Sequence, residues 1–261
     1  MVYQPAFAAT ATLDAGIEWV EAGADSTAVG LALKRLYPEA RILLITGSGS
    51  IETTDQWQQL QTWLNKDGIT SFQVRITQEP SPAIVDETVN TYRDQTIDVV
   101  IGLGGGSVLD AAKAIAGLLR MDHSVMDFLE GVGPELAYPG PAVPFIAIPT
   151  TAGTGSEATK NAVLSVQGKG GFKKSFRDEQ LVAEYALVDP ELTLTVPRDQ
   201  TAYGVCDIIT HVTEGYFNGV DGFGMPMRLL TGIVFFTAVL TMWDLELRVK
   251  EFLALIFLLV S

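Results

Sequence analysis

Two residues able to bind a metal ion stand four positions apart in the segment CDIITHVTEGYF (206–217). On a helix, Asp207 and His211 would lie about one turn apart on the same face. A carboxylate oxygen and an imidazole nitrogen in this arrangement can bind one divalent metal ion. Two ligands leave a metal site incomplete, and the chain contains only one other histidine, His123. A helical carboxylate–histidine pair without a metal is the simpler alternative, and His123 is expected to be a surface residue of a loop.

A glycine-rich turn, GLGGGSVLDAAK (102–113), follows a short apolar segment and precedes a helical pattern. Glycine permits sharp turns and lets a phosphate group approach the backbone without meeting a Cβ atom. The start of the following helix offers free N–H donors and a favourable dipole. The segment is not the G-x-G-x-x-G fingerprint, because position 107 is serine, and it is not a Walker A loop. It therefore predicts a phosphate-binding turn, with a tight turn that binds nothing as the alternative.

Two further loops rich in small residues, ITGSGSIE (45–52) and PTTAGTGSEAT (149–159), also follow apolar segments. In open parallel sheets, ligands bind beyond the carboxyl ends of the strands, so all three loops are candidates for one dinucleotide site. A carboxylate beside the ribose favours NAD over NADP, because it accepts from the 2′-hydroxyl and repels a 2′-phosphate. No acidic residue occurs at positions 47–50, so the sequence slightly favours NADP over NAD. A solvated loop is the alternative for 149–159.

The segments between these loops alternate between apolar strands and amphipathic helices. Strands are expected at 40–46, 71–76, 98–103 and 143–151, and helices at 26–37, 55–68, 82–95 and 107–120. Ser81 and Pro82 are expected at the N-cap and in the first turn of the helix at 82–95. This alternation predicts an α/β fold with a Rossmann-like parallel sheet. The pattern turns helical at Pro197, so we expect a dinucleotide-binding domain at 1–196 and a helical part at 197–261.

The net charge of −14 argues against nucleic acid as a partner, because a phosphate backbone would be repelled. A single cysteine excludes an intrachain disulfide, and the N-terminus shows no secretory signal, so a cytoplasmic location is expected. Two uncharged segments, 229–243 and 252–260, are shorter than the roughly 20 residues that span a bilayer. We expect a pair of buried helices there and no membrane anchor. An apolar surface of this size needs cover, which predicts a homo-oligomer.

Four motifs in this order resemble the iron-containing alcohol dehydrogenase family: GGGSVLDAAKAIA, IPTTAGTGSEAT, LVDPELTLTVP and TAYGVCDIITHVTEGYF. The resemblance extends from about Arg41 to Asn218. It implies an N-terminal α/β dinucleotide-binding domain and an all-helical C-terminal domain. It also implies hydride transfer between NAD or NADP and a small alcohol or aldehyde. The metal, Fe2+ or Zn2+, would polarise the substrate carbonyl as a Lewis acid.

The resemblance also assigns residues to the site. The GGGS turn would hold the pyrophosphate, and the TTAGTGSE loop would line the nicotinamide side. Gly47 falls where many NAD-preferring members carry aspartate, which agrees with the preference for NADP. Asp207 and His211 correspond to the first two of four metal ligands, normally one aspartate and three histidines. The residues expected to bind the cofactor are Gly47, Ser48, Gly49, Ser50, Gly104, Gly105, Gly106, Ser107, Asp110, Thr150, Thr151, Thr154 and Lys173.

The family's other two ligands are histidines beyond His211, and this chain has no histidine after that position. The resemblance ends near Gly222, which predicts a truncated helical domain or a change of reading frame. An active enzyme would then need its metal site completed by water, by a partner subunit or by Glu214. The alternative is a catalytically incomplete dinucleotide-binding module that oligomerises through its apolar tail. A functionless remnant is a third hypothesis.

Overall fold

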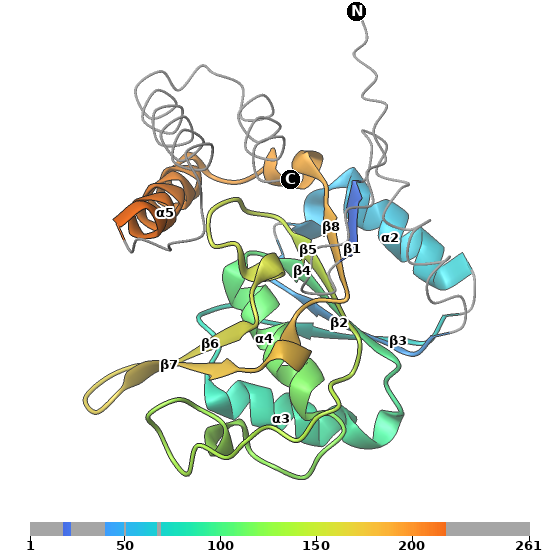
Figure 1. The fold of residues 1–261 in the computed structure, drawn as a ribbon. Helices are drawn as coiled ribbons and strands as arrows, with labels where there is room; N and C mark the ends of the chain where they lie inside the picture. Colours follow the sequence, from blue (N-terminus) through green and yellow to red (C-terminus); the bar gives the residue numbers. More distant parts are fainter. Residues whose placement is uncertain (1–17, 22–39, 50, 67–68, 218–261) are drawn as a thin grey trace, which may run out of the picture. The chain divides into compact units, whose positions relative to one another are not determined.

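A computed structural model describes residues 18–21, 40–49, 51–66 and 69–217 (Figure 1). The described residues divide into two compact units. The first contains the residues up to Pro149 together with Gly155–Asp189, and the second contains Thr150–Thr154 and the residues from Pro190 onward. The predicted division into 1–196 and 197–261 stays a prediction, because most of the second part lies outside the described residues.

A six-stranded parallel sheet forms the centre of the first unit, in the order β1-β8-β5-β4-β2-β3 (Figure 1). Every neighbouring pair in this sheet is parallel. The predicted α/β fold with a parallel sheet is therefore confirmed. The strands are β1 (Glu18–Glu21), β2 (Ile42–Thr46), β3 (Ser71–Arg75), β4 (Val99–Gly104), β5 (Phe145–Pro149) and β8 (Tyr185–Val188).

The helices of this unit are α2 (Asp55–Lys66), α3 (Pro82–Tyr92) and α4 (Gly106–Leu118). Ser81 is the N-cap of α3, as predicted, and its side chain accepts a hydrogen bond from the backbone N–H of Ile84. Short 3-10 turns complete the connections: η1 (Ile51–Thr53), η2 (Arg93–Gln95), η3 (Val125–Asp127), η4 (Ser156–Ala158) and η5 (Glu179–Leu181). The helix predicted at 26–37 lies outside the described residues.

The central strands are buried on both faces, which explains their continuous apolar sequences. On one face, Leu43 and Val100 pack with α3 and α4 in a single core cluster. On the other face, Leu44, Ile101 and Ile146 are also buried. The central strands are therefore part of the core, and the loops that follow them begin at buried positions.

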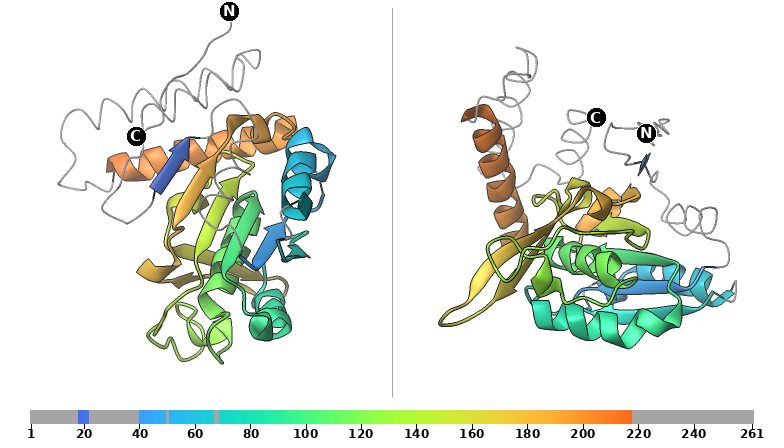
Figure 2. Two further views of the ribbon diagram at one scale, coloured as in Figure 1. Left: turned by 90° about the vertical axis from the view of Figure 1, so that its right-hand side faces the viewer. Right: turned by 60° about the horizontal axis from the view of Figure 1, so that its bottom comes forward.

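An antiparallel hairpin packs beside α4 as a second, two-stranded sheet (Figure 2). It consists of β6 (Asn161–Val166) and β7 (Phe172–Arg177). Leu164 and Phe176 enter the same core cluster as α4 and anchor the hairpin. The sequence analysis did not predict this hairpin, because three glycines and three lysines at its tip and along β7 interrupt the apolar pattern.

The strands β2 and β4 are neighbours, but the connections that leave them run in opposite directions across the sheet. β2 leads through α2 to β3 on one side, and β4 leads through α4 to β5 on the other. Such a topological switch point is where open α/β sheets bind their ligands, beyond the carboxyl ends of the strands. The loops after β2 and β4 are therefore the expected location of a ligand-binding site.

In the second unit, the structure describes the loop Thr150–Thr154, the 3-10 turn η6 (Pro190–Thr193) and the helix α5 (Arg198–Phe217). The helical pattern predicted from Pro197 is confirmed as far as Phe217. The uncharged segments 229–243 and 252–260 lie outside the described residues. None of the helices that the structure describes is both long enough and apolar enough to cross a membrane.

Candidate functional site

The N-terminus of α4 lies directly after β4 and is not capped by any side chain. Its N-cap is Gly105, which makes no side-chain hydrogen bond. The backbone carbonyl of Gly105 accepts from the N–H groups of Val108 and Leu109, at 2.9 and 3.1 Å. The N–H groups of Gly106 and Ser107 precede these in the first turn, where a helix has no intrahelical acceptor for them. The turn can therefore donate hydrogen bonds to an anion.

Gly104 is required at the end of β4 because there is no room for a side chain. A Cβ atom at this position would lie 2.6 Å from Val108 Cγ2 and 2.7 Å from Val108 Cβ. Real Cβ atoms essentially never come this close to another carbon. The glycine thus lets the first turn of α4 sit against the end of the strand, which brings the uncapped N–H groups to the switch point.

The loop after β2 borders the same helical turn. A Cβ atom at Gly47 would lie 3.7 Å from Val108 Cγ2, which is an ordinary contact distance. Gly49 has a φ of +108°, a conformation that favours glycine, and it turns the chain back into η1. Ser48 is exposed, and Ser50 lies outside the described residues. The structure therefore brings the two predicted glycine loops together around the start of α4.

A fully buried lysine, Lys113, ties α4 to the segment that follows β5. Its ammonium group donates to the backbone carbonyls of Ser156 and Asn161, at 2.7 and 2.8 Å, and to Thr159 Oγ1 at 3.1 Å. Its Nζ lies 3.9 Å from Asp110 Oδ1, and the Ser156 hydroxyl donates to the same carboxylate oxygen. Asp110, predicted to bind cofactor, thus makes structural contacts one turn inside the helix. The network fixes the position of α4 relative to η4 and β6.

Burial changes the proton affinity of both members of this pair. It raises the pKa of Asp110, an effect that Lys113 and the Ser156 hydrogen bond oppose. It lowers the pKa of Lys113 to about 8, although the carboxylates of Asp110 and Glu157 act in the opposite direction. Burial also raises the pKa of Glu157, which lies in η4. The ion pair is therefore held in surroundings that disfavour charge.

We expect the folded protein to gain stability as the pH rises from about 8 to 10.5, through Lys113. In this window the unfolded chain, whose lysine has the ordinary pKa of 10.5, binds more protons than the native state. This gain in the free energy of unfolding is absent at pH values below the pKa of Lys113 in the folded protein. It reaches at most about 3 kcal/mol at pH values above the pKa of this lysine in the unfolded chain. Urea unfolding of the wild type and of Lys113→Met over this range measures it. A difference between the two proteins that does not grow with pH would contradict the assignment.

Lys173, on β7, lies near the start of α4 but is paired with a glutamate. Its Nζ lies 3.0 Å from Glu79 Oε1. The pKa of Glu79 is lowered by a hydrogen bond from the Ser165 side chain and by this lysine. The charge of Lys173 also slightly lowers the pKa of Asp110, against the larger effect of burial. The lysine is exposed, so it can exchange Glu79 for an anionic ligand.

In the second unit, the loop Thr150–Thr154 packs against α5 through two glycines. A Cβ atom at Gly153 would lie 2.7 Å from the Gly204 backbone, and one at Gly204 would lie 2.1 Å from the Ala152 carbonyl oxygen. Asp207 and His211 follow Gly204 by three and seven positions, so the three residues share one face of α5. The predicted threonine loop and the predicted metal ligands are thus parts of one local arrangement.

The two predicted metal ligands lie one turn apart on α5, and both side chains are exposed. Among the described residues, no group of three or more His, Cys, Asp or Glu side chains could hold a metal ion. Their donor set, one carboxylate and one imidazole, suits Fe2+ or Zn2+ but supplies half of a four-coordinate site. The described part of the chain therefore fits such a metal only in part.

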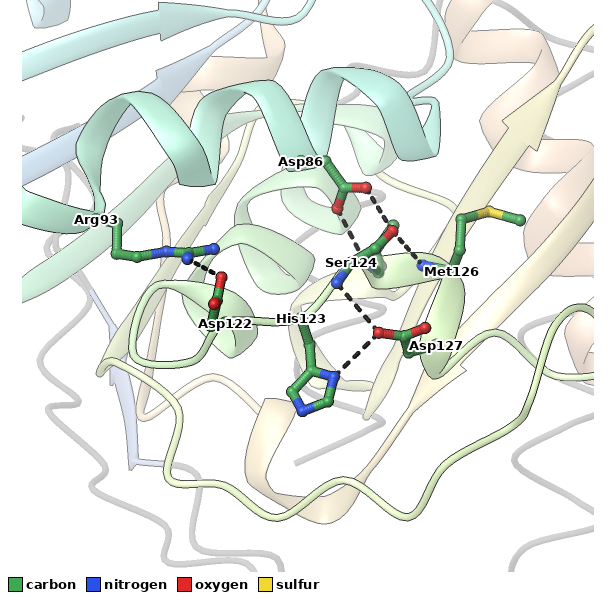
Figure 3. A network of polar contacts seen from close by, with 8 residues as sticks. Asp86, Arg93, Asp122, His123, Ser124, Met126 and Asp127 are labelled. Atoms are coloured by element: carbon green, nitrogen blue, oxygen red, sulfur yellow. Dashed lines mark hydrogen bonds and ion pairs between the residues drawn. The ribbon is translucent and has the colours of Figure 1, made fainter.

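His123 belongs to a separate network, which Figure 3 shows from close by. Its Nδ1 lies 3.0 Å from Asp127 Oδ2. The same carboxylate accepts from the backbone N–H of Ser124, whose hydroxyl in turn donates to Asp86. These contacts form a capping box at the start of η3 and tie it to α3. The prediction that His123 is an exposed loop residue is confirmed, and its role is to hold this turn.

Residues 22–190 match the family of iron-containing alcohol dehydrogenases, which is more than half of the chain. The chain belongs to the iron-containing alcohol dehydrogenase family. This is a family of oxidoreductases, as the four motifs predicted. The metal pair Asp207 and His211 lies beyond the matched residues.

Curated relatives in this alcohol dehydrogenase family support the assignment. A probable NADH-dependent butanol dehydrogenase 1 of Bacillus subtilis is 33% identical over 69% of this chain and 46% of its own length. A long-chain-alcohol dehydrogenase 1 of Geobacillus thermodenitrificans is 36% identical over 71% of this chain and 47% of its own. The chain thus spans about half the length of the curated relatives it matches.

A solved structure shows the same fold. The NADH-dependent butanol dehydrogenase A of Thermotoga maritima has a TM-score of 0.78 to this chain at 26% identity. The similarity covers 91% of this chain and 58% of that protein. The fold of the alcohol dehydrogenase family is therefore present, over little more than half of that relative.

The sequence analysis missed three contributors to this site: Lys113, Glu157 and the ion pair Glu52–Arg75. Lys113 could have been suspected, because it is the one charged residue within the apolar stretch from Ala111 to Leu119 of the α4 segment. Its hydrogen-bond acceptors lie 43 to 48 positions away in the chain, and no local pattern points to them. Glu52 lies just outside the positions 47–50 on which the preference for NADP was based.

Proposed function

We propose that this chain binds a nicotinamide dinucleotide at the β2/β4 switch point and serves hydride transfer between that cofactor and a small alcohol or aldehyde. The observation that supports this most is the uncapped N-terminus of α4, set against β4 by Gly104 and bordered by Gly47. Free N–H donors and a helix dipole at the carboxyl edge of a parallel sheet are suited to a pyrophosphate.

Each group of residues has a defined task in this proposal. The N–H groups of Gly105, Gly106 and Ser107 bind the pyrophosphate, and Lys173 adds a positive charge after leaving Glu79. Asp110 holds the turn in place through its contacts with Lys113 and Ser156. The loop with Thr150, Thr151 and Thr154 lines the nicotinamide side. These residues bind and orient the cofactor, which supplies the hydride.

Asp207 and His211 would contribute two ligands to Fe2+ or Zn2+. A divalent ion held there would polarise the substrate carbonyl as a Lewis acid. The described residues do not complete the coordination. Water, a partner subunit or Glu214, whose side chain lies outside the described part, would have to supply the rest.

The cofactor is NAD(H) or NADP(H), and two observations favour NAD(H). Several of the relatives carry the name NADH-dependent butanol dehydrogenase. The structure also brings Glu52 to the loop after β2, although this residue lies outside the positions 47–50 on which the preference for NADP rested. We therefore revise that preference and propose NAD(H).

A second candidate is a dinucleotide-binding module without turnover. The half-complete set of metal ligands among the described residues favours it. Such a protein would keep the site at the switch point and would not reduce a carbonyl.

An anaerobic assay with butanal separates the two candidates. We expect the full chain with added Fe2+, or with Zn2+, to oxidise NADH, and Asp207→Ala to lose this activity while still binding NADH. Asp199→Ala, an exposed carboxylate in the first turn of the same helix, is the control and should keep it. NADH binding without turnover under either metal would support the second candidate. Absence of NADH binding would contradict both.

A further inference from the structure

The carboxylate of Glu52 lies against the glycine loop that follows β2. The left-handed turn at Gly49 returns the chain, so that the N–H of Glu52 donates to the Gly49 carbonyl at 3.1 Å. A Cβ atom at Gly49 would lie 3.9 Å from Glu52 Oε2. Glu52, which follows the positions 47–50 in sequence, therefore lies next to them in space.

The Glu52 carboxylate is fixed by residues of β3. Arg75 donates through Nε to Oε1 at 2.9 Å and through Nη2 to Oε2 at 2.8 Å, which is a bidentate pair. The Gln73 amide donates to Glu52 Oε1 at 3.1 Å and to Thr46 Oγ1 at 3.0 Å. The side chain of Glu52 is 24% exposed and that of Arg75 is 55% exposed, so both can still meet a ligand.

This pair stands at the carboxyl edge on the β2 side of the switch point. Thr46 and Arg75 are register partners at the ends of β2 and β3, and Thr46 is also paired with Leu103 near the end of β4. A dinucleotide whose pyrophosphate lies at the start of α4 places one ribose over a strand neighbouring β4. In the function proposed above, the loop after β5 lines the nicotinamide side. The ribose over β2 is then that of the adenosine.

We propose that the Glu52–Arg75 pair makes this site select NAD(H) over NADP(H). The inference rests on the proposed function, because it needs a dinucleotide at the switch point. The Glu52 carboxylate accepts from a ribose 2′-hydroxyl and repels a 2′-phosphate. It also occupies the Nε/Nη2 edge of Arg75 and balances the positive charge that would otherwise attract that phosphate. One carboxylate thus weakens the attraction of Arg75 for the phosphate and adds a repulsion.

The test is a titration of the full chain with NADH and with NADPH, followed by the fluorescence of the reduced nicotinamide. We expect the wild type to bind NADH about tenfold or more tighter than NADPH, since juxtaposed like charges oppose the phosphate. Glu52→Gln keeps the shape and frees Arg75, so NADPH affinity should rise about tenfold while NADH affinity changes little. In Glu52→Gln/Arg75→Gln that gain should disappear.

Two further variants make the test specific. Arg75→Gln alone leaves the carboxylate uncompensated, and it should weaken NADPH binding further while NADH still binds. Glu130→Gln breaks another exposed Arg–Glu pair, with Arg177 at 3.2 Å, and should leave the NADH-to-NADPH ratio unchanged. Tighter binding of NADPH by the wild type, or an unchanged ratio in Glu52→Gln, would overturn this inference and leave dinucleotide binding intact. A wild type that binds neither cofactor would overturn the proposed function as well.

Discussion

Replacement of Lys113 by methionine is expected to lower the free energy of unfolding by about 3–5 kcal/mol, because one partner of a buried ion pair is removed. The carbonyls of Ser156 and Asn161 lose their charged donor, and Asp110 keeps a buried carboxylate without its cation. Methionine fills a similar volume, so the loss reports the polar contacts more than a cavity. Urea unfolding followed by circular dichroism at neutral pH measures the change.

The control for this variant is Lys169→Met, which removes an exposed lysine from the hairpin and should change the stability by less than about 0.5 kcal/mol. A companion variant, Lys113→Met/Asp110→Asn, removes the unpaired carboxylate too. It should regain part of the loss, because contacting residues are not additive. A loss from Lys113→Met as small as that of the control would contradict the structural role of the lysine.

The second large effect is expected at Gly104. In Gly104→Ala, the new methyl group must displace Val108, a buried and stiff β-branched residue whose Cγ2 would lie 2.6 Å away. Overpacking of this kind costs about 1–3 kcal/mol. The shift of the first turn of α4 should also weaken NADH binding about tenfold or more, because the N–H donors lose their alignment. Thermal unfolding and NADH titration measure the two effects.

Two comparisons test the steric cause. Gly47→Ala adds a methyl group at an ordinary distance of 3.7 Å from the same valine, and it should be tolerated in the unfolding experiment. Val108→Ala in the Gly104→Ala background removes two of the three close atoms. The double variant should therefore be less destabilised than the sum of the two single changes. Strict additivity would show that crowding against Val108 is not the cause.

The sequence predicted the parallel sheet because its central strands are buried on both faces and read as continuous apolar runs. β2, β3, β4 and β5 were all expected within two residues or so of their observed ends. The hairpin β6–β7 and the short strand β8 (Tyr185–Val188) were not expected. The glycine-rich turn at 167–171 is a hairpin signal that the sequence analysis did not use, whereas β8 is short and its pairing partners are set by tertiary contacts.

The candidate site was predictable where it depends on backbone shape and unpredictable where it depends on distant side chains. Glycines after β2 and β4 indicated a phosphate-binding edge from local sequence alone. Glu52 was not considered because it lies two positions beyond the residues 47–50, whereas the turn at Gly49 brings it back to them. The helical period placed Asp207 and His211 on one face of α5, but a period says nothing about ligands on other elements.

The contact between Gly153 and Gly204 means that the second unit is not one continuous segment of the chain. The second unit takes five residues, Thr150–Thr154, from the middle of the first and returns the chain to it at Gly155. A single cut near Pro190 would therefore leave this loop without the helix on which it rests. In a chimera with a relative, Thr150–Thr154 and α5 would have to be exchanged together, because neither glycine has space for a side chain. Exchange of the second unit for that of a relative thus needs three chain junctions, after Pro149, Thr154 and Asp189, and not a single one.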